Sequence, residues 1–282
     1  MKKKTFNKPS NSGFKPKSRE QPGAILKKFE PKSDPNEGIR LNKYISNAGI
    51  CSRRKADELI QNGEITVNGE VVTEMGHKVF SKDLIKYNGK KVVSDKKIYI
   101  LFNKPKDCIT TTSDEKGRKT VLDYIKESER TRLYPVGRLD RNTTGLLVLT
   151  NDGDLAQNLA HPSNSIPKLY EAQLDKNLSL TDLEKIRVGV VLEDGVAAVD
   201  AVEYSGGDKR TIGIQIHIGK NRIVRRIFEH LGYQVVKLDR ITYAGLTKKD
   251  LPRGKYRNLT EKEIVFLKYF TGKNAAKGKP RL

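Results

Sequence analysis

A polar turn that runs directly into an apolar strand, at residues 136–150, constrains this sequence most strongly. In it, Asp140 stands between two arginines, shortly before the apolar run Leu146–Leu149. Side chains two residues apart on a strand face the same way, so Arg138 and Asp140 can reach one cleft if the chain is extended there. A guanidinium beside a carboxylate favours the ionised carboxylate. From this stretch alone, a surface turn with a local ion pair explains the pattern equally well.

The charge of the chain points to an anionic partner. Its 282 residues include 55 Lys and Arg against 34 Asp and Glu, a formal net charge of +21. Such an excess favours nucleic acid as the partner, with an acidic membrane surface as the second choice. We expect residues 1–38 to form a disordered basic arm and residues 271–282 a basic tail, although both could be solubilising extensions only.

Other residue patterns narrow the class of protein. No apolar run approaches the roughly 20 residues that span a bilayer, and the Lys-rich start has no apolar segment of a secretory signal. Cys51 and Cys108 match no metal or redox spacing, and the four histidines form no ligand pattern. We therefore expect a cytoplasmic protein that needs no metal.

Residues 39–96 predict a small module of two helices followed by hairpins. Apolar residues recur at helical spacing after Leu41, and Ser52 is a good N-cap for a second helix. Two Asn-Gly pairs, at 68–69 and 88–89, separate short apolar runs, which is the pattern of two β-hairpins.

Basic side chains gather on the two predicted helices of this module. They are Arg40, Lys43, Arg53, Arg54 and Lys55. A helix N-terminus flanked by basic side chains suits RNA phosphates, although solvated helix faces carry such charges too. The sequence from 40 to 69 resembles the small RNA-binding domain first described in the fourth ribosomal protein of the small subunit. The resemblance implies structured RNA as the ligand.

Residues 97–270 predict a larger α+β domain. Strands are expected near 98–102, 146–149, 170–174, 197–202 and 211–218. Helices are expected near 121–125, 154–159, 183–188 and 223–231, with Asp154 as the cap of the second. Because no regular βαβ repeat is present, we expect a mainly antiparallel sheet with flanking helices.

A second basic cluster follows the turn at 219–222. Its members are Arg222, Arg225 and Arg226. Their spacing of three and four places them on one side of the predicted helix, opposite the apolar residues. A cationic helix start suits phosphates or a buried carboxylate equally, and a solvated helix face is the alternative.

The lone carboxylate at Asp140 limits the chemistry. Glycoside hydrolases use two carboxylates, and no partner acid is evident. Neither a Ser-His-Asp arrangement nor a phosphate loop is present. A single ionised aspartate can still act as a nucleophile or electrostatic partner at a sugar carbon.

Six motifs together resemble the ribosomal RNA pseudouridine synthases, in the branch of large-subunit synthase B and its small-subunit relative. They are Leu-Tyr-Pro-Val-Gly-Arg-Leu-Asp at 133–140, Thr-Gly-Leu-Leu at 144–147, Thr-Asn-Asp-Gly-Asp at 150–154, His-Pro at 161–162, Lys-Leu-Tyr at 168–170 and Gly-Lys-Asn-Arg-Ile-Val-Arg-Arg at 219–226. By this resemblance, Asp140 attacks or assists at C1′ of a uridine. Tyr170 stacks on the base and Arg225 pairs with the aspartate. Arg138 helps to hold the flipped-out nucleotide.

The resemblance implies cofactor-free isomerisation of a specific uridine in ribosomal RNA. It favours 23S RNA, with the same activity on 16S RNA as an alternative. The implied partner of this monomer is ribosomal RNA or a pre-ribosomal particle, with no membrane and no metal. A non-catalytic rRNA-binding assembly factor is the main alternative, and hydrolysis that releases free uracil is another. Asp140 argues against a pure binder, because a carboxylate on an RNA-facing surface repels phosphate.

Overall fold

The structure, a computed structural model, describes residues 38–126 and 131–271. The predicted basic arm and tail fall outside these ranges, except for the innermost residue of each. Among the described residues, no helix combines the length and apolar character that a bilayer span requires.

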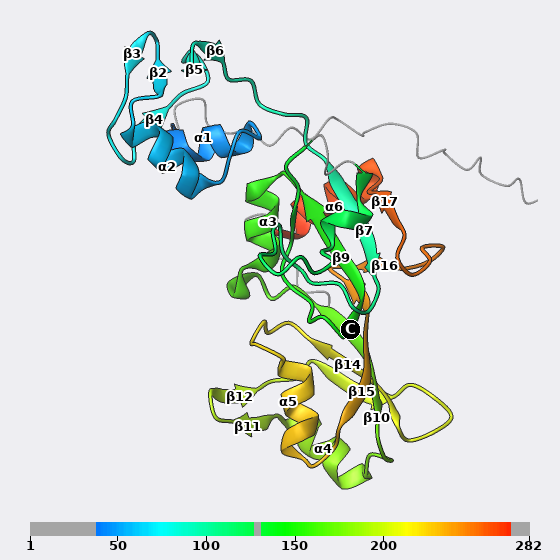
Figure 1. Cartoon of the computed structure of the whole chain (residues 1–282). Coiled ribbons are helices and arrows are strands. Elements are labelled where there is room, and N and C mark those ends of the chain that lie inside the picture. Colours follow the sequence, from blue (N-terminus) through cyan, green and yellow to red (C-terminus); the bar gives the residue numbers. More distant parts are fainter. Residues whose placement is uncertain (1–37, 127–130, 272–282) are drawn as a thin grey trace, which may run out of the picture. The chain divides into compact units, whose positions relative to one another are not determined.

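The N-terminal module follows the predicted order of elements (Figure 1). Its elements are β1 (Ile39–Arg40), α1 (Leu41–Asn47), α2 (Arg53–Gln61), β2 (Ile65–Val67), β3 (Glu70–Val71), β4 (Lys78–Val79), β5 (Ile85–Tyr87) and β6 (Lys90–Lys91). The hydroxyl of Ser52 accepts a hydrogen bond from the backbone N–H of Lys55, as expected of an N-cap. Buried residues between Leu41 and Val92 form a core of the module's own.

The larger part of the chain is built on one sheet. Its elements are β7 (Tyr99–Lys104), η1 (Leu122–Tyr124), β8 (Tyr134–Pro135), β9 (Thr144–Thr150), α3 (Gly153–Ala160), η3 (Pro162–Asn164), β10 (Lys168–Leu174), α4 (Leu180–Val188), β11 (Val190–Leu192), β12 (Gly195–Ala197), β13 (Ala201–Tyr204), β14 (Thr211–Ile216), α5 (Ile223–His230), β15 (Val235–Tyr243), β16 (Leu246–Thr247), β17 (Tyr256–Asn258) and α6 (Glu261–Thr271).

The strand order in this sheet is β13-β14-β10-β15-β9-β7-β17, with β16 on β15 and β8 on β9. Only β15 and β9 pair in parallel among the described strands, so the predicted mainly antiparallel α+β fold is confirmed. That one parallel contact joins the two halves of the sheet.

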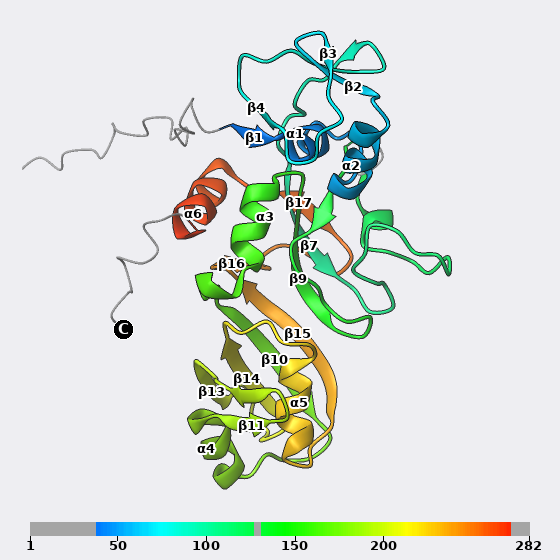
Figure 2. The same ribbon diagram turned by 90° about the vertical axis from the view of Figure 1, so that its left-hand side faces the viewer.

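Both faces of the sheet are covered, which explains the continuous apolar runs in its strands. Along β9, Leu147 and Leu149 pack into one core with the apolar side of α5. Leu146 and Val148 point the other way, into a core with residues of α3 and α6. Figure 2 shows α3 and α6 side by side.

Three local predictions were wrong. The segment 121–125 forms one 3₁₀ turn rather than an α-helix, because the N–H of Ile125 bonds to the carbonyl of Leu122, three residues back, and Ile125 itself is already extended, at φ −114° and ψ 109°. The single strand expected at 197–202 is two strands, because β12 pairs with β11 whereas β13 pairs with β14.

The third concerns the start of α3. Asp152 rather than Asp154 is the N-cap, since its carboxylate accepts a hydrogen bond from the N–H of Leu155. The helix therefore begins two residues earlier than a cap at Asp154 predicts, at Gly153.

Candidate active site

A cavity of about 380 Å³ is bordered by β10, β14, β15 and the start of α5, which lie together in Figure 1. Its polar and charged lining residues are Arg138, Asp140, Lys168, Tyr170, Lys220, Asn221, Arg222, Arg240 and Tyr243. Among the residues that the structure describes, Asp140 supplies the cavity's one carboxylate. A hollow in the N-terminal module, lined by residues such as Tyr87 and Lys91, contains no carboxylate.

Asp140 is paired with an arginine from another element. Its Oδ2 lies 3.9 Å from Nε of Arg225 on α5, and the Asp140 side chain is 37% exposed while that of Arg225 is 10% exposed. Nη1 of Arg225 donates to the carbonyl of Val235 at 2.7 Å, which anchors the guanidinium in the core. Burial and the charge of Arg222 lower the pKa of Arg225, and Asp140 acts in the opposite direction. A desolvated guanidinium thus holds an accessible carboxylate at the cavity wall.

Tyr170 supplies an aromatic surface to the same cavity. It is central in β10, paired with Ile214 of β14 and Arg240 of β15, and only 7% exposed. A flat ring on a cavity wall can stack against a nucleobase.

Comparisons with known proteins identify the family. The profile described as RNA pseudouridylate synthase matches residues 98–230, and that of the S4 domain matches residues 39–85. Ribosomal large subunit pseudouridine synthase B from Bacillus subtilis is 44% identical over 84% of this chain and 99% of its own length. The chain belongs to the RNA pseudouridine synthases.

Further relatives agree. The synthase is 34% identical to the dual-specificity RNA pseudouridine synthase RluF from Escherichia coli, over 88% of this chain and 84% of the relative. A crystal structure of a pseudouridylate synthase superimposes with a TM-score of 0.59 at 26% identity, covering 81% of this chain and 99% of that one. The fold described above is therefore the fold of this family.

The structure separates the three arginines that the helical spacing grouped together. Arg225 is buried, whereas Arg222 and Arg226 are more exposed, so the prediction of one shared polar side was wrong. Helix α5 packs on one face of the sheet, and Arg225 is the arginine that it buries there, beside Asp140. Arg222 lines the cavity, while Arg226 forms a two-pronged ion pair with Asp194 at 2.7 and 3.0 Å and is not on the wall.

Arg138 reaches the cavity by a different backbone path from the one expected. Strand β8 ends at Pro135, and Gly137 has φ +73°, so the chain turns before Arg138 instead of continuing as a strand. Arg138 and Asp140 nevertheless both line the cavity.

Lys104 is a site residue that the sequence analysis missed. Its side chain is fully buried, and Nζ donates to the carbonyls of Asp140, Arg141 and Thr143 at 3.0, 3.2 and 2.8 Å. Burial lowers its pKa. One ammonium from β7 thus fixes the backbone that carries Asp140, and the only sequence signal is a lysine that ends an apolar strand.

A β-bulge sets the rest of the cavity wall. Tyr170 pairs with Arg240 and Lys168 with Tyr243, so the register shifts by one residue between these pairs. The extra residue puts Arg240 and Tyr243, three apart in β15, on the same face as the two β10 residues. All four line the cavity. Sequence spacing alone assigned no role to Arg240 or Lys168, because an alternating pattern does not reveal a bulge.

The predicted RNA-binding residues of the S4 domain lie on its first two helices. Arg40 precedes α1 and Lys43 lies within it, while Arg53, Arg54 and Lys55 form the first turn of α2. Arg53 and Arg54 are exposed. Lys55 pairs with Glu58 at 2.6 Å. Over residues 38–126 and 131–271, no group of His, Cys, Asp and Glu is arranged to hold a metal ion.

Proposed function

We propose that this synthase converts a specific uridine of 23S ribosomal RNA to pseudouridine in the cytoplasm, without a cofactor. The single observation that carries the chemistry is Asp140, the one carboxylate among the described residues of a cavity lined by cations and two tyrosines. The S4 domain and the net charge of +21 support an RNA substrate. The similarity to the Bacillus subtilis relative, named for the large ribosomal subunit, favours 23S RNA.

The target base must leave its stack before it can reach Asp140. Flipping a nucleotide out of a helix costs a few kcal/mol of lost stacking and pairing. Stacking of the base on Tyr170 returns roughly 1–3 kcal/mol. Arg138 and Arg222, at the more exposed part of the lining, are placed to hold the backbone phosphates of the flipped nucleotide.

The reaction proposed is an exchange of one sugar–base bond for another. The C1′–N1 bond breaks and its electron pair stays on the uracil ring, while the Asp140 carboxylate takes up the electron deficiency at C1′. The detached uracil turns within the cavity, and C5 forms a new bond to C1′. The proton on C5 is then lost and N1 gains one, so no atom or electron is added overall. Arg225 pairs with Asp140 and holds its carboxylate in position throughout.

Replacing Asp140 by Asn tests the proposal. Asp140→Asn removes the negative charge but keeps the size, so pseudouridine formation in unmodified 23S transcripts should fall by on the order of 10⁴-fold or more. RNA affinity should stay within about twofold, because the carboxylate makes no attractive contact with phosphate. Pseudouridine mapping and filter binding measure the two quantities.

Asp107→Asn is a matched control. Asp107 also pairs with an arginine, Arg141 at 3.1 Å, but it is exposed and does not line the cavity. It should retain wild-type activity. Full activity of Asp140→Asn contradicts the mechanism, release of free uracil identifies a hydrolase, and modification of 16S transcripts alone transfers the proposal to the small subunit.

A further inference from the structure

Two cations on the wall of the Asp140 cavity, one buried and one part-buried, form no ion pair among the described residues. Arg240 is 2% exposed, and Lys168 is part-buried beside it on β10. In the part of the chain that the structure describes, neither forms an ion pair. A buried positive charge without a counter-charge is costly to the fold, and it persists where a ligand supplies the negative charge.

The guanidinium of Arg240 is fixed in position, but one of its buried donor atoms has no hydrogen-bond partner. Its Nε donates to the carbonyl of Leu146 at 2.7 Å, and its guanidinium lies 4.6 Å from the centre of the Tyr243 ring. Its Nη2 is buried and has no hydrogen-bond partner. A fixed guanidinium with one unused donor atom is a preorganised site for an oxygen of the bound ligand.

Close strand packing fixes this position. Gly145 of β9 pairs with Arg240 in the parallel contact, at φ +108°. A Cβ on Gly145 would lie 2.3 Å from the Arg240 carbonyl oxygen, so no other residue permits this approach. The backbone of Arg240 is therefore fixed by a close approach of β9 and β15.

Lys168 adds a second positive charge. Its Nζ donates to the carbonyls of His217 at 2.7 Å and Ile166 at 3.1 Å, which uses two of its three protons. Burial, followed by the nearby charge of Arg240, lowers the pKa of Lys168 to about 8. The two cations therefore influence each other, as expected if both face one anionic group.

We propose that Arg240, supported by Lys168, stabilises the negative charge on the uracil ring after the C1′–N1 bond breaks. This inference rests on the proposed function. The electron pair left on N1 is delocalised onto the carbonyl oxygens O2 and O4, and Nη2 of Arg240 donates to one of them. When C5 attacks C1′ and N1 is reprotonated, that charge disappears and the hydrogen bond weakens.

The position of Arg240 favours a base oxygen over a phosphate. Arg240 is directly opposite Tyr170, on which the base stacks, and both are almost fully buried. Phosphates remain solvated and meet exposed arginines such as Arg138. A donor aimed at charge that develops during the reaction contributes to rate rather than to binding.

The test compares two leaving bases. Arg240→Gln and Arg240→Lys are assayed under single turnover on full-length 23S transcripts made with uridine or with 5-fluorouridine, and the nucleosides are separated after digestion. Because C5 of 5-fluorouracil has no proton to lose, its C-glycoside keeps the fluorine and takes up water at C6, so disappearance of the starting nucleoside is the rate that is compared. Fluorine withdraws electrons, so its uracil anion needs less help. With uridine, Arg240→Gln should be slower by about 10²–10³-fold. With 5-fluorouridine the loss should be smaller by roughly tenfold, and Arg240→Lys should recover part of the rate with both.

Arg253→Gln is the structural control. Arg253 is also an arginine packed against β15, but it pairs with Asp239 and does not line the cavity. Any loss it causes through the fold should be equal with the two bases. Melting temperatures establish that each variant is folded.

Three outcomes decide the matter. A smaller loss with 5-fluorouridine for Arg240→Gln alone supports the inference. Equal losses with both bases overturn it and assign Arg240 a structural role, while a fall in RNA affinity with an unchanged rate overturns it in favour of phosphate binding. If Asp140→Asn stays active in the same assay, the proposed function fails instead.

Discussion

Asp239 and Arg240 are neighbours on β15, yet among the described residues only the charge of Asp239 is paired with opposite charges. Asp239 accepts two hydrogen bonds from Arg253, at 2.9 and 3.0 Å, and one from Thr144 at 2.9 Å. It also forms an ion pair with Lys248. Arg240 points to the other face, toward the cavity, and meets no acid among the described residues.

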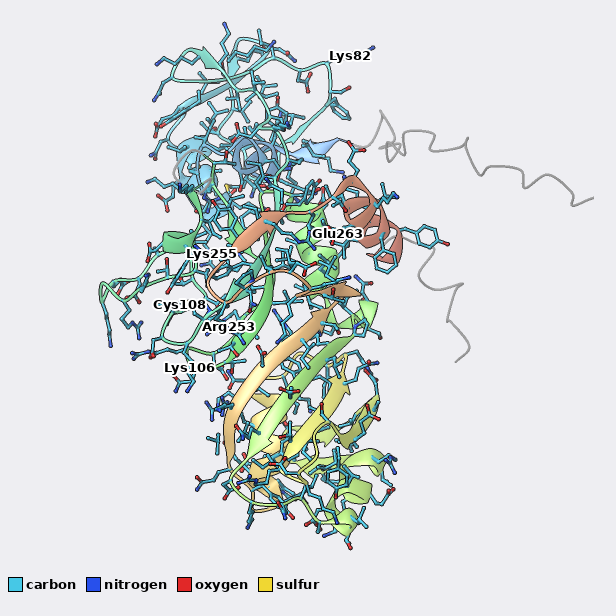
Figure 3. All side chains as sticks on the ribbon, turned by 90° about the vertical axis from the view of Figure 1, so that its right-hand side faces the viewer. Lys82, Lys106, Cys108, Arg253, Lys255 and Glu263 are labelled. Carbon is cyan, nitrogen blue, oxygen red and sulfur yellow. The ribbon has the colours of Figure 1, made fainter. Side chains whose placement is uncertain are left out.

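We infer from this difference that the charges around Asp239 stabilise the fold, whereas the charge of Arg240 is available to a ligand. Arg253 also donates to Asn103 on β7 at 2.7 Å, so its pair with Asp239 ties the segment before β17 to two strands. Figure 3 labels Arg253 and Lys255, which both lie in the segment before β17. On the cavity face, our proposal assigns the compensating negative charge to the bound uracil.

Removing the acid on the structural face should produce the largest effect on stability. Burial alone would raise the pKa of Asp239, but the hydrogen bonds from Arg253, Lys248 and Thr144 outweigh it and lower the pKa. Asp239→Asn leaves two cations without a partner. Because Arg253 is 41% exposed, we expect the free energy of unfolding to fall by about 2 kcal/mol, less than for a fully buried pair.

Urea denaturation measures this loss. Glu58→Gln, which breaks the exposed Lys55 pair, should cost less than about 0.5 kcal/mol. Equal effects of the two substitutions would show that the Asp239 cluster is not structural.

Titration of Lys168 tests whether the cavity cations contribute to the reaction rate. Its pKa of about 8 lies below the ordinary value of 10.5, owing to burial and Arg240, while Asp200 acts in the opposite direction. The ammonium is charged below pH 8 and neutral above it. We therefore expect the single-turnover rate on uridine to fall as pH rises through about 8, by up to roughly tenfold.

Stability should change in the opposite direction in the same range. Between pH 8 and 10.5 the unfolded chain binds more protons at this lysine, so its contribution to the free energy of unfolding rises with pH. Lys168→Arg keeps the charge and should abolish the decline in rate. A decline that persists in Lys168→Arg assigns the titration to another group.

The smallest effect is expected from the exposed charges of the S4 domain. Arg53→Gln with Arg54→Gln should weaken binding to 23S transcripts by roughly threefold at 0.15 M salt and flatten the salt dependence by up to about two units of slope. Filter binding over a salt series measures both. The turnover rate of bound RNA should not change, and an unaltered salt slope would exclude these two residues from the RNA contact.

Local signals in the sequence predicted much of the fold. Ser52 at its cap position and the two Asn-Gly turns depend on neighbouring residues only, and the structure confirms them. The strand that follows the Asp140 turn was recognisable from its apolar run. The 3₁₀ turn at Leu122 was not, because the spacing of apolar residues does not show that the chain becomes extended again at Ile125.

The site was less predictable because its parts depend on register and layer packing. The orientation of Arg240 results from a bulge whose partner strand is some seventy residues earlier in the chain. Helical spacing alone could not tell which arginine of α5 faces the sheet. Lys104 could be recognised only once its carbonyl partners had been brought together.

Lys104 also has a consequence for folding. The backbone that carries Asp140 is fixed by a lysine up to 39 residues away, so it acquires its shape only after β7 and β9 have paired. Such non-local contacts form late, after the loop between them has closed. Catalytic competence should thus follow the pairing of β7 with β9, and a nascent chain without this pairing has no working active site.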